Sequence, residues 1–206
     1  MELLREDKIK IEQAIKTVES TTSGEIVPAI FTQSDFYPAS HFRLAITIGI
    51  LIPTLSLLTE WPEGPGSILW LQLPGLVLGY YLAYIPTLKR WFSTKKEIAE
   101  EVHQRALQAF FENNLHTTKD RTGILIMVSA LEHRVEILAD KGINDKVEVE
   151  TWNKILTPFI DQIKNDQLID GLVDTIVECG KVLTEYFPIK SDDRNELSNK
   201  IVTDKS

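Results

Sequence analysis

Two long stretches without a charged side chain constrain this chain more than any other feature of its sequence. Charged residues make up 25% of the 206 residues, yet none occurs from Leu44 to Thr59 or from Gly64 to Leu88. The apolar body of the second stretch, Ile68–Leu88, would span about 30 Å as a helix, which matches the hydrocarbon core of a bilayer. The first stretch spans a bilayer only if its aromatic flanks lie in the interfaces or the bilayer thins locally. We therefore expect a transmembrane helical hairpin over residues 43–88.

Two other structures are compatible with the same stretches. A re-entrant hairpin, which dips into the bilayer and returns, is favoured by the shortness of the first stretch. A helical hairpin buried in a soluble core is less expected, because two consecutive apolar helices are hard to bury in a chain of this length. Pro53 and Pro74 fall inside the stretches, and membrane helices tolerate proline better than soluble helices do.

Basic residues near the ends of the hairpin predict its orientation, because cytoplasmic flanks of membrane helices are enriched in Lys and Arg. The loop between the two stretches carries Glu60 and Glu63 and no basic residue. The outer flanks carry Arg43, Lys89, Arg90, Lys95 and Lys96. We therefore expect an integral membrane protein with two transmembrane segments, with the lipid bilayer as a partner and with the soluble residues and both termini in the cytoplasm.

Composition excludes several classes of protein. The single cysteine, Cys179, excludes a disulfide framework and a zinc cluster built on cysteines. The net charge of −8 argues against nucleic acid as a partner. His103 and His116 lack the spacing of zinc ligands.

The arm before the hairpin holds only part of a fold. Apolar residues at Ile11, Ile15 and Val18 recur at helical spacing, and the run Glu25–Phe31 reads as a short strand. One helix and one strand cannot bury a core by themselves. They are therefore expected to pair with residues that follow the hairpin.

The arm after the hairpin predicts the missing elements. Thr94 and Glu97 have capping-box spacing at the start of a helix. The runs 123–130 and 134–140 read as strands and are close enough to form an antiparallel hairpin. Two further apolar stripes, over 152–163 and 172–187, predict helices, the first bent or interrupted by Pro158.

Together the two arms predict an α/β fold, a small mixed-sheet α/β/α sandwich interrupted by a two-helix transmembrane hairpin. The soluble domain is discontinuous and comprises residues 1–42 and 89–188. Residues 189–206 are expected to form a polar, mobile tail.

Three blocks of this sequence resemble the TPM domain family, also called the TPM phosphatase domain: TTSGEIVPAIF, RTGILIMVSALEHRVEILADKGI and DGLVDTIVECGKVLTEYFP. The resemblance covers roughly residues 9–31 and 94–188. It implies a mixed sheet between helices and membrane association. The roles it implies are acid phosphatase activity, divalent-cation binding, or service as an accessory to a membrane complex.

Carboxylates at the predicted strand ends are candidate metal ligands. Asp120, Asp140 and Asp145 could hold Ca²⁺ or Mg²⁺ through carboxylate oxygens, or could be solvated turn residues. A metal-dependent phosphomonoesterase would use such a cation to neutralise phosphoryl charge. The turn Glu132–Arg134 lies at the opposite end of the predicted hairpin. Its residues form either a pH-sensitive or ligand-binding tip or an ordinary charged turn.

Acidic residues recur every four positions along the last predicted helix, at Asp170, Asp174 and Glu178. This stripe either docks a basic partner or is a solvated helix face. The sequence favours a non-enzymatic, membrane-anchored TPM-like accessory module that binds a protein partner at the membrane. The alternative is the phosphomonoesterase. A transporter or channel subunit is less favoured, since neither span carries an ionisable residue that would mark a pathway.

Overall fold

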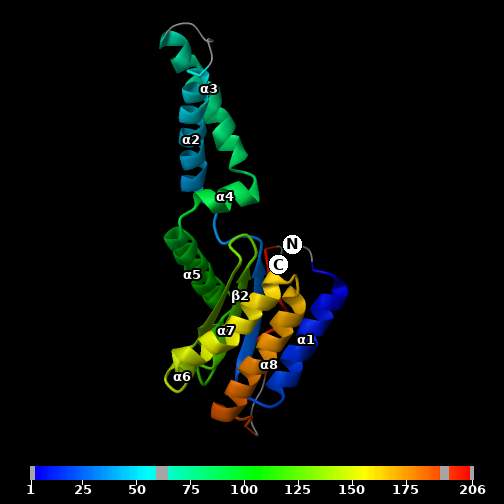
Figure 1. The fold of residues 1–206 in the computed structure, drawn as a ribbon. Coiled ribbons are helices and arrows are strands. Elements are labelled where there is room, and N and C mark those ends of the chain that lie inside the picture. Colours follow the sequence, from blue (N-terminus) through cyan, green and yellow to red (C-terminus); the bar gives the residue numbers. More distant parts are fainter. Residues whose placement is uncertain (1–2, 59–64, 191–194, 205–206) are drawn as a thin grey trace. The chain divides into compact units, whose positions relative to one another are not determined.

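The computed structural model describes residues 3–58, 65–190 and 195–204. The chain forms two compact units (Figure 1): an α/β unit of residues 1–34 and 101–206, and a hairpin unit of residues 35–100. The hairpin unit therefore begins earlier and ends later than the predicted hairpin, 43–88. The predicted loop containing Glu60 and Glu63 lies outside the described residues.

A four-stranded mixed sheet forms the centre of the α/β unit. Its strand order is β3-β2-β1-β4, with β1 (Glu25–Phe31), β2 (Gly123–Ser129), β3 (Arg134–Ala139) and β4 (Val202–Thr203). Strands β1 and β2 are parallel, from Glu25 opposite Gly123 to Phe31 opposite Ser129. Strand β3 runs antiparallel to β2. The predicted mixed sheet and the predicted antiparallel hairpin are thus confirmed.

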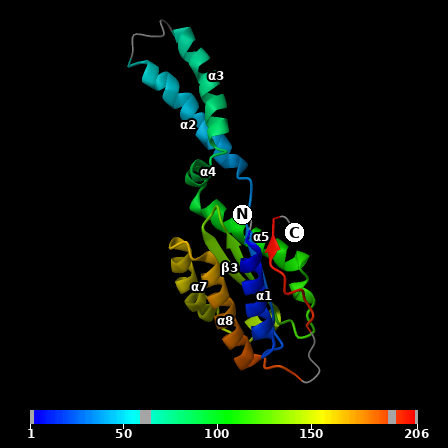
Figure 2. The same cartoon turned by 90° about the vertical axis from the view of Figure 1, so that its right-hand side faces the viewer.

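Helices cover both faces of the sheet, which explains why β1 and β2 are buried along their whole length. On one face α1 (Arg5–Glu19), α7 (Val149–Lys164) and α8 (Leu168–Tyr186) enclose the main core (Figure 2). The end of α5 (Lys95–Glu112) covers the other face, where the Arg105 guanidinium lies 3.9 Å from the centre of the Phe31 ring.

Two elements of the α/β unit differ from the sequence prediction. Helix α7 continues through Pro158 without interruption. The segment predicted as a polar tail contains β4, whose Val202 and Thr203 pair with Ala29 and Ile30 of β1. Ile201, just before β4, is 7% exposed and belongs to the main core. The end of the chain therefore completes the sheet.

Glycine is required where the short helix α6 (Lys141–Asn144) passes the turn before β2. A Cβ on Gly142 would lie 2.7 Å from the carbonyl oxygen of Arg121 and closer still to that of Asp120. At the start of β2, a Cβ on Gly123 would lie 2.5 Å from the carbonyl oxygen of Leu115, in the 3₁₀ turn Leu115–Thr117. These two glycines of the TPM-like blocks therefore have a packing role.

Among its described residues, the hairpin unit contains α2 (Pro38–Ser56), α3 (Pro65–Leu82), α4 (Pro86–Phe92) and the first turns of α5. Helices α2 and α3 are antiparallel and approach closely, because small residues face each other. A Cβ on Gly79 would lie 2.6 Å from the Leu44 carbonyl oxygen, and one on Gly75 would lie 3.0 Å from the Gly49 Cα. Such close approach at glycines is common between membrane helices.

The predicted continuous helix Ile68–Leu88 is wrong, because α3 ends at Leu82 and α4 begins at Pro86. Ile85 takes an extended conformation, as residues before proline favour, and Pro86 occupies the first turn of α4. Among the described residues, α2 alone is long and apolar enough to cross a membrane. The segments Ile68–Leu82 and Pro86–Phe92 pass that test only together, with a bend of 106° between them.

Candidate functional site

The outer surface of α2 and α3 is apolar and exposed. Arg43 is the one Asp, Glu, Lys or Arg within the bounds of these two helices. Large hydrophobic side chains along both helices are roughly half exposed or more: Ile46, Ile50, Leu51, Leu55, Leu69, Trp70, Leu73 and Val77. An apolar surface of this length marks a site of association with a membrane or with another protein.

Aromatic side chains gather at the end of the hairpin where α2 begins and α3 ends. The rings of Tyr80, Tyr81 and Tyr84 contact one another. His41 lies against Tyr80 and Tyr84, and its Nδ1 is 3.2 Å from the Tyr80 carbonyl oxygen. Tyrosine clusters of this kind are enriched where a membrane helix meets the headgroup layer.

An ion pair joins α2 to the first turn of α5. Arg43 donates two hydrogen bonds to the Glu97 carboxylate, at 2.6 and 2.7 Å. The Arg43 guanidinium, together with the Thr94 backbone N–H, lowers the pKa of Glu97 to about 2. Thr94 and Glu97 also form the predicted capping box, since the Glu97 N–H donates to the Thr94 hydroxyl.

The basic residues predicted to orient the hairpin are not equivalent. Arg43 forms an ion pair with Glu97, and Lys89 is buried, with 8% of its surface exposed. Arg90, Lys95 and Lys96 are exposed. The exposed positive charge therefore lies on α4 and the first turn of α5.

The three candidate metal ligands have different surroundings. Asp140 is 5% exposed and accepts hydrogen bonds from Arg121, at 2.6 and 2.9 Å, and from the Lys141 N–H at the start of α6. Asp120 pairs with Lys190, and Asp145 is exposed at the end of α6. Within the described ranges, no group of three or more His, Cys, Asp or Glu side chains is suited to a metal ion. Asp140 serves as a helix cap and ion-pair partner.

A carboxyl pair that sequence reasoning missed lies at the amino end of β1. Glu25 is 7% exposed, and Glu19 at the end of α1 accepts a hydrogen bond from the Ile26 N–H. Burial, and then the charge of Glu25, raise the pKa of Glu19 to about 8. Asn199 donates to Glu19, and the Glu196 N–H donates to Glu25. The pair thus joins the end of the chain to the sheet.

The opposite end of the sheet is closed by a buried hydrogen-bond network. The Ser129 hydroxyl donates to the Glu132 carboxylate at 2.5 Å, and the Ser34 N–H donates to the same carboxylate at 2.8 Å. Ser129 and Glu132 are 0% and 3% exposed. Ligands commonly bind at this carboxyl end in open α/β sheets, and here the buried Ser129 and Glu132 side chains hydrogen-bond to each other.

The charged turn Glu132–Arg134 at this end is part buried and part exposed. Glu132 belongs to the buried network, whereas His133 and Arg134 are exposed. His133 has a left-handed backbone, with φ of 51°. His103 pairs with Glu136 on β3, and its Nδ1 lies 2.5 Å from the Glu136 carboxylate oxygen.

The acidic stripe on α8 is exposed, and each of its members already has a partner within the chain. Asp170 pairs with Lys10, Asp174 accepts a hydrogen bond from Gln162, and Glu178 pairs with Lys181. Exposed pairs of this kind contribute little to stability. Cys179, beside the stripe, is fully buried, and burial raises the pKa of its thiol well above the usual range.

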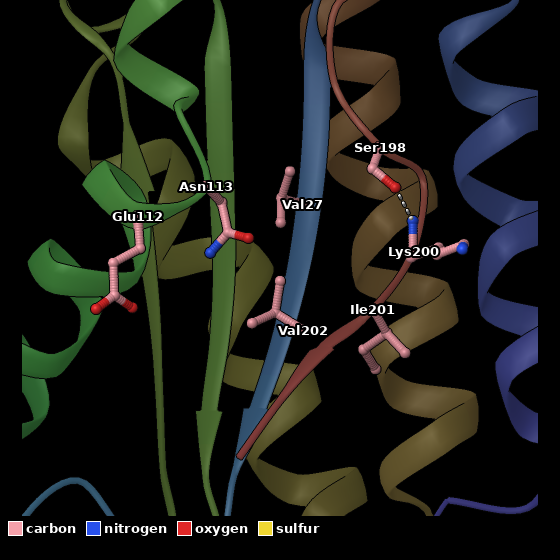
Figure 3. A pocket seen from close by; sticks show the side chains of 7 residues that line it. All are labelled: Val27, Glu112, Asn113, Ser198, Lys200, Ile201 and Val202. Atoms are coloured by element: carbon pink, nitrogen blue, oxygen red, sulfur yellow. Dashed lines mark hydrogen bonds between the residues drawn. The ribbon is translucent and has the colours of Figure 1, made fainter. Parts of the chain in front are cut away.

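An open hollow of about 380 Å³ lies beside β1, between the end of α5 and the segment 198–202 (Figure 3). Its lining includes the charged residues Glu112 and Lys200 and the neutral polar residues Asn113 and Ser198. The Lys200 N–H donates to the Ser198 hydroxyl. The lining holds no nucleophile activated by a base and no convergent carboxylates, so it does not define a catalytic site.

Comparisons with known proteins bear on the fold. Residues 83–182, a little under half of the chain, match the TPM domain family. The fold is similar to the NMR structure of the BA42 protein from the psychrophilic bacterium Bizionia argentinensis. The TM-score is 0.63 at 24% sequence identity, over 98% of this chain and 96% of that chain. No curated protein matches the sequence. Residues 83–182 thus resemble a TPM domain, a domain of uncertain function, within a mixed α/β fold.

Proposed function

We propose that this protein is a membrane-anchored TPM-like module, whose hairpin unit inserts into a bilayer and whose α/β unit binds a protein partner in the cytoplasm. The observation that carries the first part is the exposed apolar surface of α2 and α3, with no charged side chain after Arg43. In water this surface would be a severe aggregation liability. In a bilayer these apolar side chains would contact the lipid chains. The close approach of α2 and α3 at their glycines also favours a membrane hairpin.

The orientation of the hairpin is part of this proposal. The exposed cations Arg90, Lys95 and Lys96 lie at the end of the hairpin that leads to the α/β unit, which favours a cytoplasmic location for that unit. A cysteine placed at Glu63 is expected to react with an impermeant thiol reagent from outside the membrane. A cysteine at the exposed Lys154 is expected to stay unlabelled until the membrane is permeabilised. Reversed labelling would overturn the orientation.

Membrane insertion is tested by introducing charge at the middle of the hairpin. The native protein is expected to stay with the membrane during alkaline carbonate extraction. Lysine in place of Ile46 and Leu73, which are 54% and 55% exposed, costs about 3 kcal/mol each near the centre of a bilayer. The double variant is therefore expected in the soluble fraction.

A matched control places lysine at Ile9 and Val149, which are 44% and 73% exposed on the α/β unit. That variant is expected to remain with the membrane. Carbonate release of the native protein would contradict membrane insertion.

Partner binding is supported by the acidic stripe on α8, because its exposed ion pairs can be exchanged for a basic partner at little cost. A photo-crosslinking residue at Glu178 is expected to capture one protein in mild detergent, whereas the same residue at Lys154 on α7 is not. With the probe kept at position 178, changing Asp170 and Asp174 to their amides is expected to reduce capture severalfold. Recovery of the protein alone in several detergents would contradict this part of the proposal.

A further inference from the structure

Helix α4 is turned sharply away from the hairpin that precedes it. Its axis makes an angle of 106° with that of α3. If α3 crosses the bilayer close to the membrane normal, α4 lies within about 20° of the membrane plane. Arg43 of α2 donates a 3.0 Å hydrogen bond to the Phe92 carbonyl oxygen at the end of α4, so α4 is held against the base of the hairpin.

The outer face of α4 combines an aromatic ring with a cation. Trp91 is 82% exposed, and Arg90 beside it is exposed, whereas Lys89 is 8% exposed. Tyr84 and Ile85, at the bend, continue the exposed apolar surface of the hairpin. Helices that lie in the headgroup layer have this composition, with Trp at the hydrocarbon boundary and Lys or Arg toward the phosphates.

Positive charge continues from α4 into the first turn of α5. Lys95 and Lys96 are exposed, although cations at the amino end of a helix oppose its dipole. The Glu97 carboxylate is paired with Arg43, and the Glu100 Oε1 lies 3.6 Å from the Lys96 Nζ. The local excess of positive charge stands out in a chain whose net charge is −8.

We propose that α4 lies in the headgroup layer of the cytoplasmic leaflet and that Arg90, Lys95 and Lys96 bind anionic phospholipids. This inference rests on the proposed function, because α4 reaches the headgroups only if the hairpin is inserted. The partner is defined by charge complementarity, since clustered Lys and Arg next to a membrane helix attract acidic headgroups. The α/β unit would then be held at an acidic patch of lipid.

Trp91 provides the probe. The full chain with Trp61→Phe and Trp70→Phe retains Trp91 and the buried Trp152, and a third change, Trp91→Phe, gives the background from Trp152. The protein is reconstituted in phosphatidylcholine vesicles that contain an equal mole fraction of either brominated phosphatidylserine or brominated phosphatidylcholine. Bromine quenches the fluorescence of nearby tryptophan.

Brominated phosphatidylserine is expected to quench Trp91 about twofold more than brominated phosphatidylcholine, because anionic lipid is enriched near the three cations. The preference is expected to vanish in 1 M salt, where the screening length falls to about 3 Å. Bromine near the headgroup is expected to quench more strongly than bromine deep in the chain, because Trp91 lies at the interface.

Charge-neutral variants separate lipid recognition from insertion. Changing Arg90, Lys95 and Lys96 to Gln is expected to abolish the preference while quenching by brominated phosphatidylcholine persists. The same change at Lys154, Lys164 and Lys181, which are exposed on α7 and α8, is expected to leave the preference intact.

The outcomes distinguish this inference from the proposed function. Equal quenching by the two lipids would overturn lipid recognition and leave insertion standing. A matching variant that keeps Trp70 and lacks Trp61 and Trp91 reports on α3. Quenching of Trp70 without quenching of Trp91 would show that α4 lies outside the headgroup layer. Absence of quenching at both positions would overturn the proposed function itself.

Discussion

The variant Gly142→Ala is expected to lose about 3 kcal/mol of folding free energy, which corresponds to a fall of roughly 10 °C in the unfolding temperature of the α/β unit. The added methyl group would lie 2.7 Å from the Arg121 carbonyl oxygen and closer still to that of Asp120. Both neighbours are backbone atoms, so no side-chain rotation relieves the contact. Helix α6 would have to move away from the turn that leads into β2. Thermal unfolding of the full chain in detergent, followed by near-ultraviolet circular dichroism, measures the effect.

Gly66→Ala is the matched control, because a Cβ at Gly66 in α3 meets nothing within 4 Å. Alanine is favoured over glycine inside a helix by about 1 kcal/mol. This variant is therefore expected to unfold at the native temperature or slightly above it. Similar unfolding temperatures for Gly142→Ala and the native protein would show that α6 adapts to the methyl group.

The variant Glu19→Gln is expected to be more stable than the native protein by about 2 kcal/mol at pH 8, and about equally stable near pH 4.5. The folded protein raises the pKa of Glu19 from 4.5 to about 8, chiefly by burial. Between these values the unfolded chain has lost a proton that the folded chain keeps, so native stability falls as pH rises. For a fully buried carboxyl group, a pKa shift of this size would lower the free energy of unfolding by several kcal/mol at pH 8. The Glu19 side chain is partly exposed, so the expected loss is smaller. Glutamine cannot ionise, and its stability is therefore expected to vary less with pH.

Urea unfolding from pH 4.5 to 8.5 measures this difference, with Trp61, Trp70 and Trp91 changed to Phe in every variant so that the fluorescence comes from the buried Trp152. Glu185→Gln on α8 is the control, because Glu185 is exposed and its change is expected to leave the pH profile unaltered. Parallel pH profiles for Glu19→Gln and the native protein would mean that Glu19 is ionised in the folded state.

Local patterns predicted the elements that depend on continuous apolarity or helical spacing. The sequence predicts β1 with the bounds that the structure shows, because a short apolar run follows Glu25. The capping box at Thr94 was also found, because its two partners lie three residues apart. Pro28 is tolerated within β1 because β4 pairs only with Ala29 and Ile30 beyond it.

The features that were missed depend on contacts that a local pattern does not record. Strand β4 consists of two residues in a polar segment, and the sheet selects it through β1 and the buried Ile201. The raised pKa of Glu19 depends on burial and on the charge of Glu25, and it is opposed by a hydrogen bond from Asn199, which lies 180 positions further along the chain. The sequence Ile85–Pro86 indicates the break between α3 and α4. The prediction of one continuous helix relied instead on the absence of charged residues through Leu88.

The candidate sites were likewise predicted in position but not in their contacts with residues elsewhere in the chain. The sequence placed Asp120 and Asp140 at one end of the β-hairpin and Glu132 at the other, as the strand register confirms. It did not predict that Arg121 would engage Asp140, or that Ser129 would engage Glu132 in a buried network. Whether a carboxylate is available to a ligand depends on such neighbours.

The parallel pairing of β1 with β2 has a consequence for the order in which the protein is made. Each β1 residue pairs with a residue 98 positions later, from Glu25 with Gly123 to Phe31 with Ser129. During synthesis, α1 and β1 leave the ribosome first, and their partner strand follows only after the whole hairpin unit. The contact between Arg43 and Glu97 draws the ends of that unit together. If this contact forms before the sheet, it shortens the loop that must close, which lowers the entropic cost by about 1 kcal/mol. Folding of the hairpin unit first would then favour pairing of the two strands that it separates.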